Sequence, residues 1–210
     1  MAQDVATTDM TKASTRRLQR TASGYLLLLL LTLLSQPSEP GTQAMLALTV
    51  TGLLCVSAAC LGRIWCSVFI AGRKDQELVT HGPYALCRHP LYALSLLGGL
   101  GIGLATLSLS LTLAVLAGLW WLLRAAAKNE ERHLAARFGD NYERYQRETP
   151  SLWPGRWQRV NELPTSLNVH PPILWKAFVD AGAFFVLFVC VVLARQISLQ
   201  GLLASWLVLP

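Results

Sequence analysis

Residues 91–123 read LYALSLLGGLGIGLATLSLSLTLAVLAGLWWLL and carry no charged side chain in 33 positions. At roughly 1.5 Å per residue, this stretch is longer than one upright helix needs to cross a ~30 Å hydrocarbon layer. The turn-prone Thr106–Ser110 lies near its middle. The stretch therefore predicts a helical hairpin at 90–128, with arms at about 90–105 and 109–128.

The composition of the whole chain indicates an integral membrane protein. Of its 210 residues 53% are hydrophobic and 14% are charged, whereas a soluble domain carries about 25% charged residues. The mean hydropathy is +0.41. We expect an all-α, polytopic helical membrane protein with about five transmembrane helices.

Three more apolar runs complete that count. They predict helices near residues 20–36, 42–70 and 173–193. The apolar segment 197–210 is too short to span a membrane, so we expect it at the interface or against the bundle. We divide the chain into a basic tail (1–21), two helices (22–72), a core (73–155), and a region with a polar connector, the last helix and the apolar end (156–210).

Lysine and arginine set the expected orientation. The net charge is +6, and the basic segments 1–21, 72–90 and 124–170 all fall on one side of a five-helix arrangement, which should be cytoplasmic. Arg195 is a small exception. No basic patch interleaved with aromatic residues predicts a nucleic-acid partner, so the expected partners are the bilayer and a lipophilic substrate.

The cysteines indicate neither a disulfide framework nor a zinc site. None forms a CxxC pair, and four of the five lie in apolar segments, where a thiol behaves as a small hydrophobe. They are Cys55, Cys60, Cys66, Cys87 and Cys190. We expect no bound metal.

Two polar clusters flank the hairpin. GPYALCRHPLY occupies residues 82–92, and Glu130-Glu131 begins the second cluster, which continues to residue 145. Ionisable side chains are expensive at membrane depth unless they pair or serve a site. Folding the hairpin brings both clusters to one end, which predicts a shared pocket at the membrane surface.

The ordered set of motifs resembles the isoprenylcysteine carboxyl methyltransferase family, to whose broad group the phospholipid N-methyltransferases belong. The similarity covers about residues 75–155 and rests on Gly82-Pro83-Tyr84, Arg88-His89-Pro90-Leu91-Tyr92, Glu130-Glu131, Phe138-Gly139-x-x-Tyr142-x-x-Tyr145 and Pro150. It implies a membrane methyltransferase that uses S-adenosylmethionine and releases S-adenosylhomocysteine. The residues it implies for cofactor binding are Gln76, Glu77, Leu78, Val79, Tyr84, His89, Pro90, Leu91, Tyr92 and Glu130.

The chemistry of the cofactor fits these residue types. A carboxylate needs donors such as His89 or Arg88, a ribose hydroxyl or ammonium suits Glu130, and the rings of Tyr84 and Tyr92 can stack on adenine or face a sulfonium. Pro90 suits the first position of a helix.

The methyl acceptor stays open. We take Arg88 and Glu131 as the catalytic candidates; a carboxylate acceptor needs no base, whereas an amine or thiol would need one, such as Glu131 or His133. The family's substrate arginine corresponds to Ala126 here, so Arg124 and Lys128 become the substrate-binding candidates. The alternatives are a prenylated-cysteine carboxylate, a phospholipid amine, a small thiol, a membrane reductase of the sterol type, or a module without catalysis.

Simpler explanations exist for single residues. His133 and the Glu pair fit a solvated helix face, and Tyr142 and Tyr145 fit anchors at the lipid headgroups. Arg63, inside the run 42–70, fits snorkelling to the interface, or a charge that lines the pocket. Phe138-Gly139 fits a helix C-cap.

Overall fold

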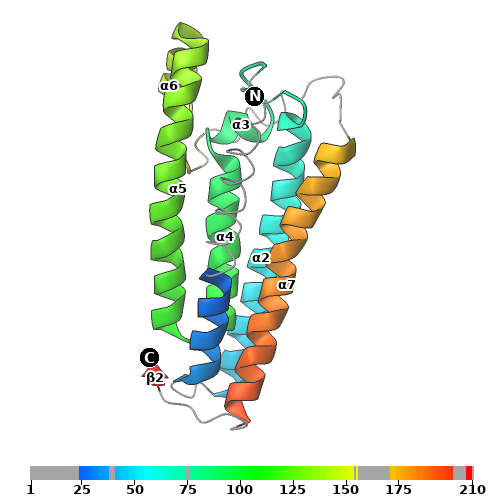
Figure 1. Cartoon of the computed structure of the whole chain (residues 1–210), viewed down its shortest axis with the longest axis vertical. Coiled ribbons are helices and arrows are strands. Elements are labelled where there is room, and N and C mark those ends of the chain that lie inside the picture. The colour runs from blue at the N-terminus through cyan, green and yellow to red at the C-terminus, as the bar shows by residue number, and fades with distance from the viewer. Residues whose placement is uncertain are drawn as a thin grey trace, which may run out of the picture.

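The computed structural model describes residues 24–37, 41–73, 76–153, 155, 171–200 and 207–209. The predicted basic tail and the connector at 156–170 lie outside these residues. In chain order the elements are an apolar helix Gly24–Leu34, β1 (Ser35–Pro37), α2 (Thr42–Ile70), α3 (Pro83–Leu86), α4 (Pro90–Ala105), α5 (Leu109–Phe138), α6 (Asp140–Glu148), α7 (Pro171–Leu199) and β2 (Leu207–Leu209) (Figure 1).

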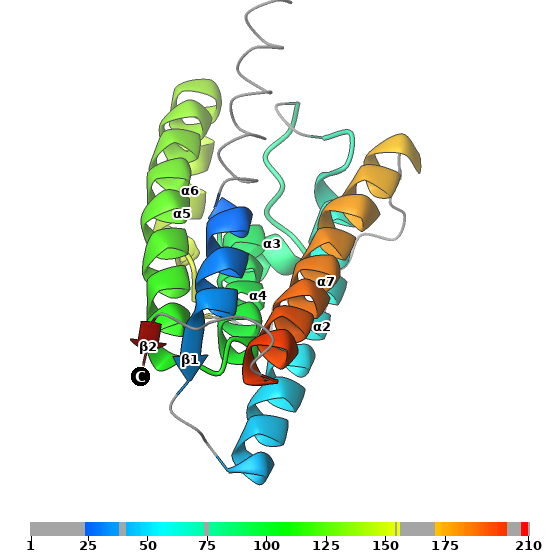
Figure 2. The same ribbon diagram turned by 60° about the horizontal axis from the view of Figure 1, so that its bottom comes forward.

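Helices make up almost all of the described structure, as the sequence predicts. The exception is a parallel pairing of β1 with β2, in which Gln36 lies opposite Val208. Figure 2 shows this pair at the end of the bundle opposite α3. The last helix extends to Leu199, six residues beyond its expected end, and residues 207–209 pair with β1.

The structure supports a multi-pass membrane protein by helix length and composition. Among the described residues, α2, α5 and α7 are long and apolar enough to cross a bilayer, whereas Gly24–Leu34 and α4 are apolar but shorter. Within the described ranges three helices therefore meet the requirement, fewer than the five predicted. The other two are too short there, because α4 has only 16 residues and Gly24–Leu34 is shorter still, whereas a span needs about 20.

The predicted hairpin is present as α4 and α5. Pro90 occupies the first turn of α4, and His89 is its N-cap. The turn is held by the Thr106 hydroxyl, which donates to the Gly103 carbonyl at 2.7 Å, and by the Ser108 hydroxyl, which accepts from the Leu111 amide at 3.3 Å. The polar residues that suggested a turn thus satisfy its backbone groups.

Helix α4 lies at the centre of the bundle and contacts α2, α5 and α7 (Figure 1). The core around it is apolar and includes Val56, Ile102, Phe188 and Val191. The backbones of α2 and α4 approach closely at Gly52 and Gly101, because a Cβ on Gly52 would lie 2.6 Å from the Gly101 carbonyl oxygen. Small residues allow this approach between helices in lipid.

Two arginines inside the apolar helices are used for packing. Arg63 does not snorkel, because its Nη1 donates to the Ser95 hydroxyl at 2.7 Å and its guanidinium lies over the Phe184 ring at 5.2 Å. It is also not among the residues that line the cavity described below. Arg195 is 1% exposed and donates to the Ser35 carbonyl at 2.7 Å. This contact holds α7 against β1. It explains why Arg195 can lie on the side expected to be opposite to the other basic segments.

Replacing Gly101 by alanine should destabilise the bundle, because the new methyl group would overlap the Gly52 carbonyl. Overpacking of this kind costs about 1–3 kcal/mol. The measurement is the thermal unfolding midpoint in detergent. Gly118→Ala on α5 is the matched control, because no atom lies within 4 Å of its added Cβ; equal destabilisation by both variants would contradict the close packing of α2 and α4.

Candidate functional site

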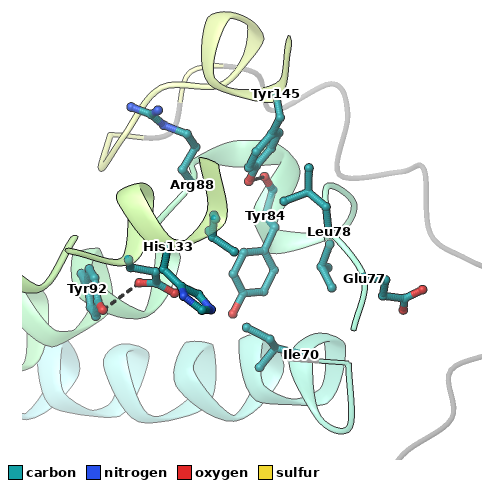
Figure 3. A pocket seen from close by; sticks show the side chains of 11 residues that line it. Ile70, Glu77, Leu78, Tyr84, Arg88, Tyr92, His133 and Tyr145 are labelled. Atoms are coloured by element: carbon teal, nitrogen blue, oxygen red, sulfur yellow. Dashed lines mark hydrogen bonds between the residues drawn. The ribbon is translucent and has the colours of Figure 1, made fainter. Parts of the chain in front are cut away.

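A cavity of about 350 Å³ lies where the end of α2, the loop before α3, α4, α5 and α6 meet (Figure 3). Its volume falls within the ~300–1,000 Å³ of small-molecule sites. The lining combines apolar side chains with a few polar ones. These residues are Ile70, Glu77, Leu78, Val79, Tyr84, Arg88, Tyr92, Glu130, His133, Leu134 and Tyr145.

The Gly-Pro-Tyr motif turns the chain into the site. Gly82 has a positive φ of 61°, and a Cβ there would overlap the Phe69 ring, so glycine is required twice over. Pro83 then begins α3, whose four residues are all buried. This short helix places the Tyr84 ring in the cavity.

The two ends of the hairpin meet in a cluster of charges. Arg88 Nη2 lies 3.2 Å and His89 Nε2 lies 3.1 Å from Glu131 Oε1. His89 Nδ1 lies 3.5 Å from Glu130 Oε2. The imidazole, 4% exposed, therefore has a carboxylate on either side.

Tyr92 extends this cluster into the cavity. Its hydroxyl donates to Glu130 Oε2 at 2.8 Å, and its ring stacks on His89 with centroids 5.3 Å apart. These contacts fix the direction of the Glu130 carboxylate, whose residue lines the cavity.

Helix α6 and the segment after it hold the motif from outside. We call residues Thr149–Trp153 the strap. The Arg88 amide donates to the Pro150 carbonyl at 2.9 Å, and the His89 amide donates to the Ser151 carbonyl at 3.0 Å. The strap thereby fixes the backbone of Arg88 and His89, the two residues that contact the glutamates.

The aromatic residues of α6 are buried and do not act as headgroup anchors. Tyr142 and Tyr145 are 1% and 8% exposed, and the Tyr145 hydroxyl donates to the Tyr84 carbonyl at 2.7 Å. Burial, more than the nearby Glu131 charge, raises the pKa of Tyr142, although the Arg88 charge lowers it. Both phenols are therefore neutral, and Tyr145 is part of the cavity lining.

Tyr84 has an unsatisfied polar group. Its hydroxyl is buried and has no hydrogen-bond partner within the described part of the chain, and Figure 3 shows it directed into the cavity. Burial, then the nearby Cys66 and Glu130, raises its pKa well above the ordinary value. A neutral phenol that faces a cavity is a hydrogen-bond donor for a ligand; left unpaired, such a group costs about 1–3 kcal/mol.

The structure separates the predicted site residues into three groups. Those that line the cavity are Glu77, Leu78, Val79, Tyr84, Arg88, Tyr92 and Glu130. Those that lie behind it are His89 and Glu131, which position the first group, together with Pro90 and Leu91 of the first turn of α4. Those that lie away from the lining are Gln76, Arg124 and Lys128, all exposed.

Four lining residues were not among the predicted cofactor-binding residues: Ile70, His133, Leu134 and Tyr145. Of these, the sequence suggested His133 only as a candidate base and Tyr145 only as part of the motif set. For two of them a signal existed, because side chains three and four positions apart share one helix face. His133 and Leu134 follow Glu130 at these spacings on α5. Tyr145 comes from a helix whose docking only the folded structure reveals.

Comparisons with known proteins show what the sequence around this site is similar to. The model of the phospholipid methyltransferase family matches residues 42–141. Residues 42–141, just under half of the chain, are thus similar to that family. The matched range contains the Arg88–His89 motif and both glutamates of the charge cluster, and the resemblance seen in the sequence is confirmed.

Three curated relatives extend the comparison. The chain is 44% identical over 114 residues to the cobalt-zinc-cadmium resistance protein CzcN of Cupriavidus metallidurans, covering 54% of this chain and 52% of the relative. It is 44% identical over 108 residues to the nickel-cobalt-cadmium resistance protein NccN of Alcaligenes xylosoxydans xylosoxydans, covering 51% and 50%. It is 37% identical over 81 residues to the protein-S-isoprenylcysteine O-methyltransferase of Schizosaccharomyces pombe, covering 39% and 34%.

The chain thus spans about half the length of the two resistance proteins and about a third of the yeast enzyme. No solved structure matches. These matches show what part of the chain is similar to, and the activity of the whole protein is argued below from the site.

Tyr145→Phe should loosen the site, because the buried Tyr84 carbonyl loses its donor at a cost of about 1–3 kcal/mol. Unfolding in detergent and protease cleavage after α6 are the measurements. The control is Glu143→Gln, which breaks an exposed pair with Arg147 on the same helix and should change little. A larger effect of the control would show that α6 is not held by Tyr145.

Proposed function

We propose that this chain transfers a methyl group from S-adenosylmethionine to a lipophilic acceptor at the membrane surface. The observation that carries the proposal is the cavity bounded by the anchored Glu130 carboxylate and the unsatisfied Tyr84 hydroxyl. Similarity to the family supports the reaction class. The basic segments support placing the site on the cytoplasmic side.

The residues present fit this cofactor chemically. When bound, S-adenosylmethionine supplies a methyl group activated by a cationic sulfonium. Glu130, already oriented by Tyr92, would accept hydrogen bonds from ribose hydroxyls or the ammonium. Tyr84 would donate one from its buried hydroxyl, and Arg88 would face the cofactor carboxylate from the cavity wall.

The chain's remaining task is alignment and exclusion of water. Direct displacement requires the acceptor, the methyl carbon and the leaving atom in line, and positioning alone can provide much of the acceleration. Ile70, Leu78, Val79 and Leu134 give the cavity an apolar wall. We propose that the lipid part of the acceptor binds along this wall.

Glu130→Gln should weaken binding of S-adenosylhomocysteine by at least about tenfold, since it removes a charge-assisted contact to the ligand worth about 1.5–3 kcal/mol. His89→Ala should weaken binding as well, since it removes the contacts that position Glu130 and Glu131. Calorimetry on the purified protein measures binding, and thermal unfolding measures folding. Glu143→Gln is the control, an exposed glutamate on α6. If the wild-type protein does not bind the ligand, the chain is a module without catalysis; if the variants lose folding and binding equally, the site assignment is wrong.

A second candidate function concerns metal tolerance, which the printed names of the two resistance proteins favour. Among the described residues there is no group of three or more His, Cys, Asp or Glu side chains placed to hold a metal ion. We propose that any such role acts through methylation of a membrane component.

Host cells that express the chain should therefore tolerate a higher cadmium concentration and should incorporate labelled methyl groups into a lipid extract. Glu130→Gln should abolish both effects, because both would depend on methyl transfer at the site that contains this carboxylate. Growth curves and lipid counting are the measurements. If Glu130→Gln keeps the tolerance but loses the label, tolerance does not depend on methyl transfer.

A further inference from the structure

We infer that His133 accepts the proton of the methyl acceptor, so that the acceptor is an amine or a thiol rather than a carboxylate. The inference rests on the proposed methyltransferase function and deepens it by naming the chemical class of substrate. It concerns a residue that the sequence motifs do not assign.

His133 is placed for this role by α5. It lies one helical turn after Glu130 and lines the same cavity. Figure 3 shows its imidazole directed into the cavity, on the side where the Tyr84 hydroxyl points. The residue is also exposed at the rim, so a proton it receives has a direct path to water.

The other groups that face the cavity have different duties. They are Glu77, Tyr84, Arg88, Tyr92, Glu130 and Tyr145. Glu77 pairs with Arg73 at 3.0 Å, and Glu130 accepts from Tyr92. Arg88 and the three phenols are protonated near neutral pH, so they cannot take up a proton there.

The alternative base, Glu131, is also occupied. Its Oε1 lies within 3.2 Å of Arg88 and 3.1 Å of His89, and the residue does not line the cavity. His89 is buried between the two glutamates. An imidazole is the side chain best suited to accept a proton near neutral pH, and His133 is the histidine that lines the cavity.

The reaction can be written so that atoms and charge balance. The lone pair of a neutral amine or of a thiol forms the bond to the methyl carbon, and the carbon–sulfur bond breaks with its electron pair left on the departing sulfur. As the acceptor atom becomes cationic in the transition state, it gives its proton to the His133 imidazole. From there the proton passes to water.

The charge of the cavity makes this timing favourable. A bound sulfonium cation disfavours a second cation nearby, so His133 should be neutral before transfer. Loss of the sulfonium charge removes that repulsion at the moment when the proton must be taken up. A carboxylate acceptor would leave no proton to collect.

The first test observes the His133 ring directly by NMR and needs no methyl acceptor. The chain has four histidines, so carbon-13 labelling of their rings gives few NMR signals, and His133→Gln and His81→Gln assign two of them. At one fixed neutral pH we expect the ring signal of His133 to differ between the complexes with S-adenosylmethionine and S-adenosylhomocysteine, because the two ligands differ by one charge a few ångströms away. The ring signal of His81 should be the same in both complexes. Identical His133 signals in two demonstrated complexes would overturn the inference.

The second test identifies the acceptor class. Host membrane extract is incubated with labelled methyl donor, and the product is treated with mild base, which releases methyl esters as methanol but leaves N-methyl and S-methyl groups intact. We expect a base-stable label, reduced at least about 100-fold by His133→Ala at neutral pH and partly restored by added imidazole. His81→Ala should leave it unchanged.

A base-labile label, or His133→Ala activity equal to wild type, would overturn the inference and leave the methyltransferase function intact. No binding of either ligand and no label at all would instead refute the proposed function.

Discussion

The charge cluster that joins the two ends of the hairpin is the interaction on which the rest of the site depends. Arg88 and His89 lie before α4, Glu130 and Glu131 lie in the polar half of α5, and 3.1–3.5 Å separate their atoms. Charges beside apolar helices are costly unless they pair. The pairing therefore favours an antiparallel hairpin whose polar ends coincide, and this arrangement creates the cavity.

Glu130 and Glu131 face different directions although they are adjacent, because a helix turns by about 100° per residue. Glu130 lines the cavity, whereas Glu131 faces Arg88 and His89. The strap and α6 add a second layer, holding the backbone of Arg88 and His89 and the carbonyl of Tyr84. The site thus has one wall that would meet a ligand and a support that keeps that wall in position.

The sequence was sufficient for features that depend on local physics. The hairpin, the start of α4 at Pro90, and Gly139 as the C-cap of α5 with a positive φ of 50° follow from charge spacing, proline and glycine. It was insufficient where distant helices dock. Tyr142 and Tyr145 have the spacing of interface anchors, yet both are buried, and Tyr145 donates a hydrogen bond to the Tyr84 carbonyl. Arg63 bonds across to α4 instead of reaching the interface.

The recognition of the acceptor follows from which side chains surround the anchored carboxylate. Ala126 lies one turn before Glu130, where the resemblance leads one to expect an arginine, and Arg124 and Lys128 are exposed away from the cavity lining. An anionic acceptor would therefore find Arg88 as its cation within the lining, and Glu131 already pairs with Arg88. A neutral amine or thiol needs no such partner; it needs a proton acceptor, and the lining provides an imidazole one turn beyond Glu130. The missing cation on α5 and the added imidazole favour the same class of substrate.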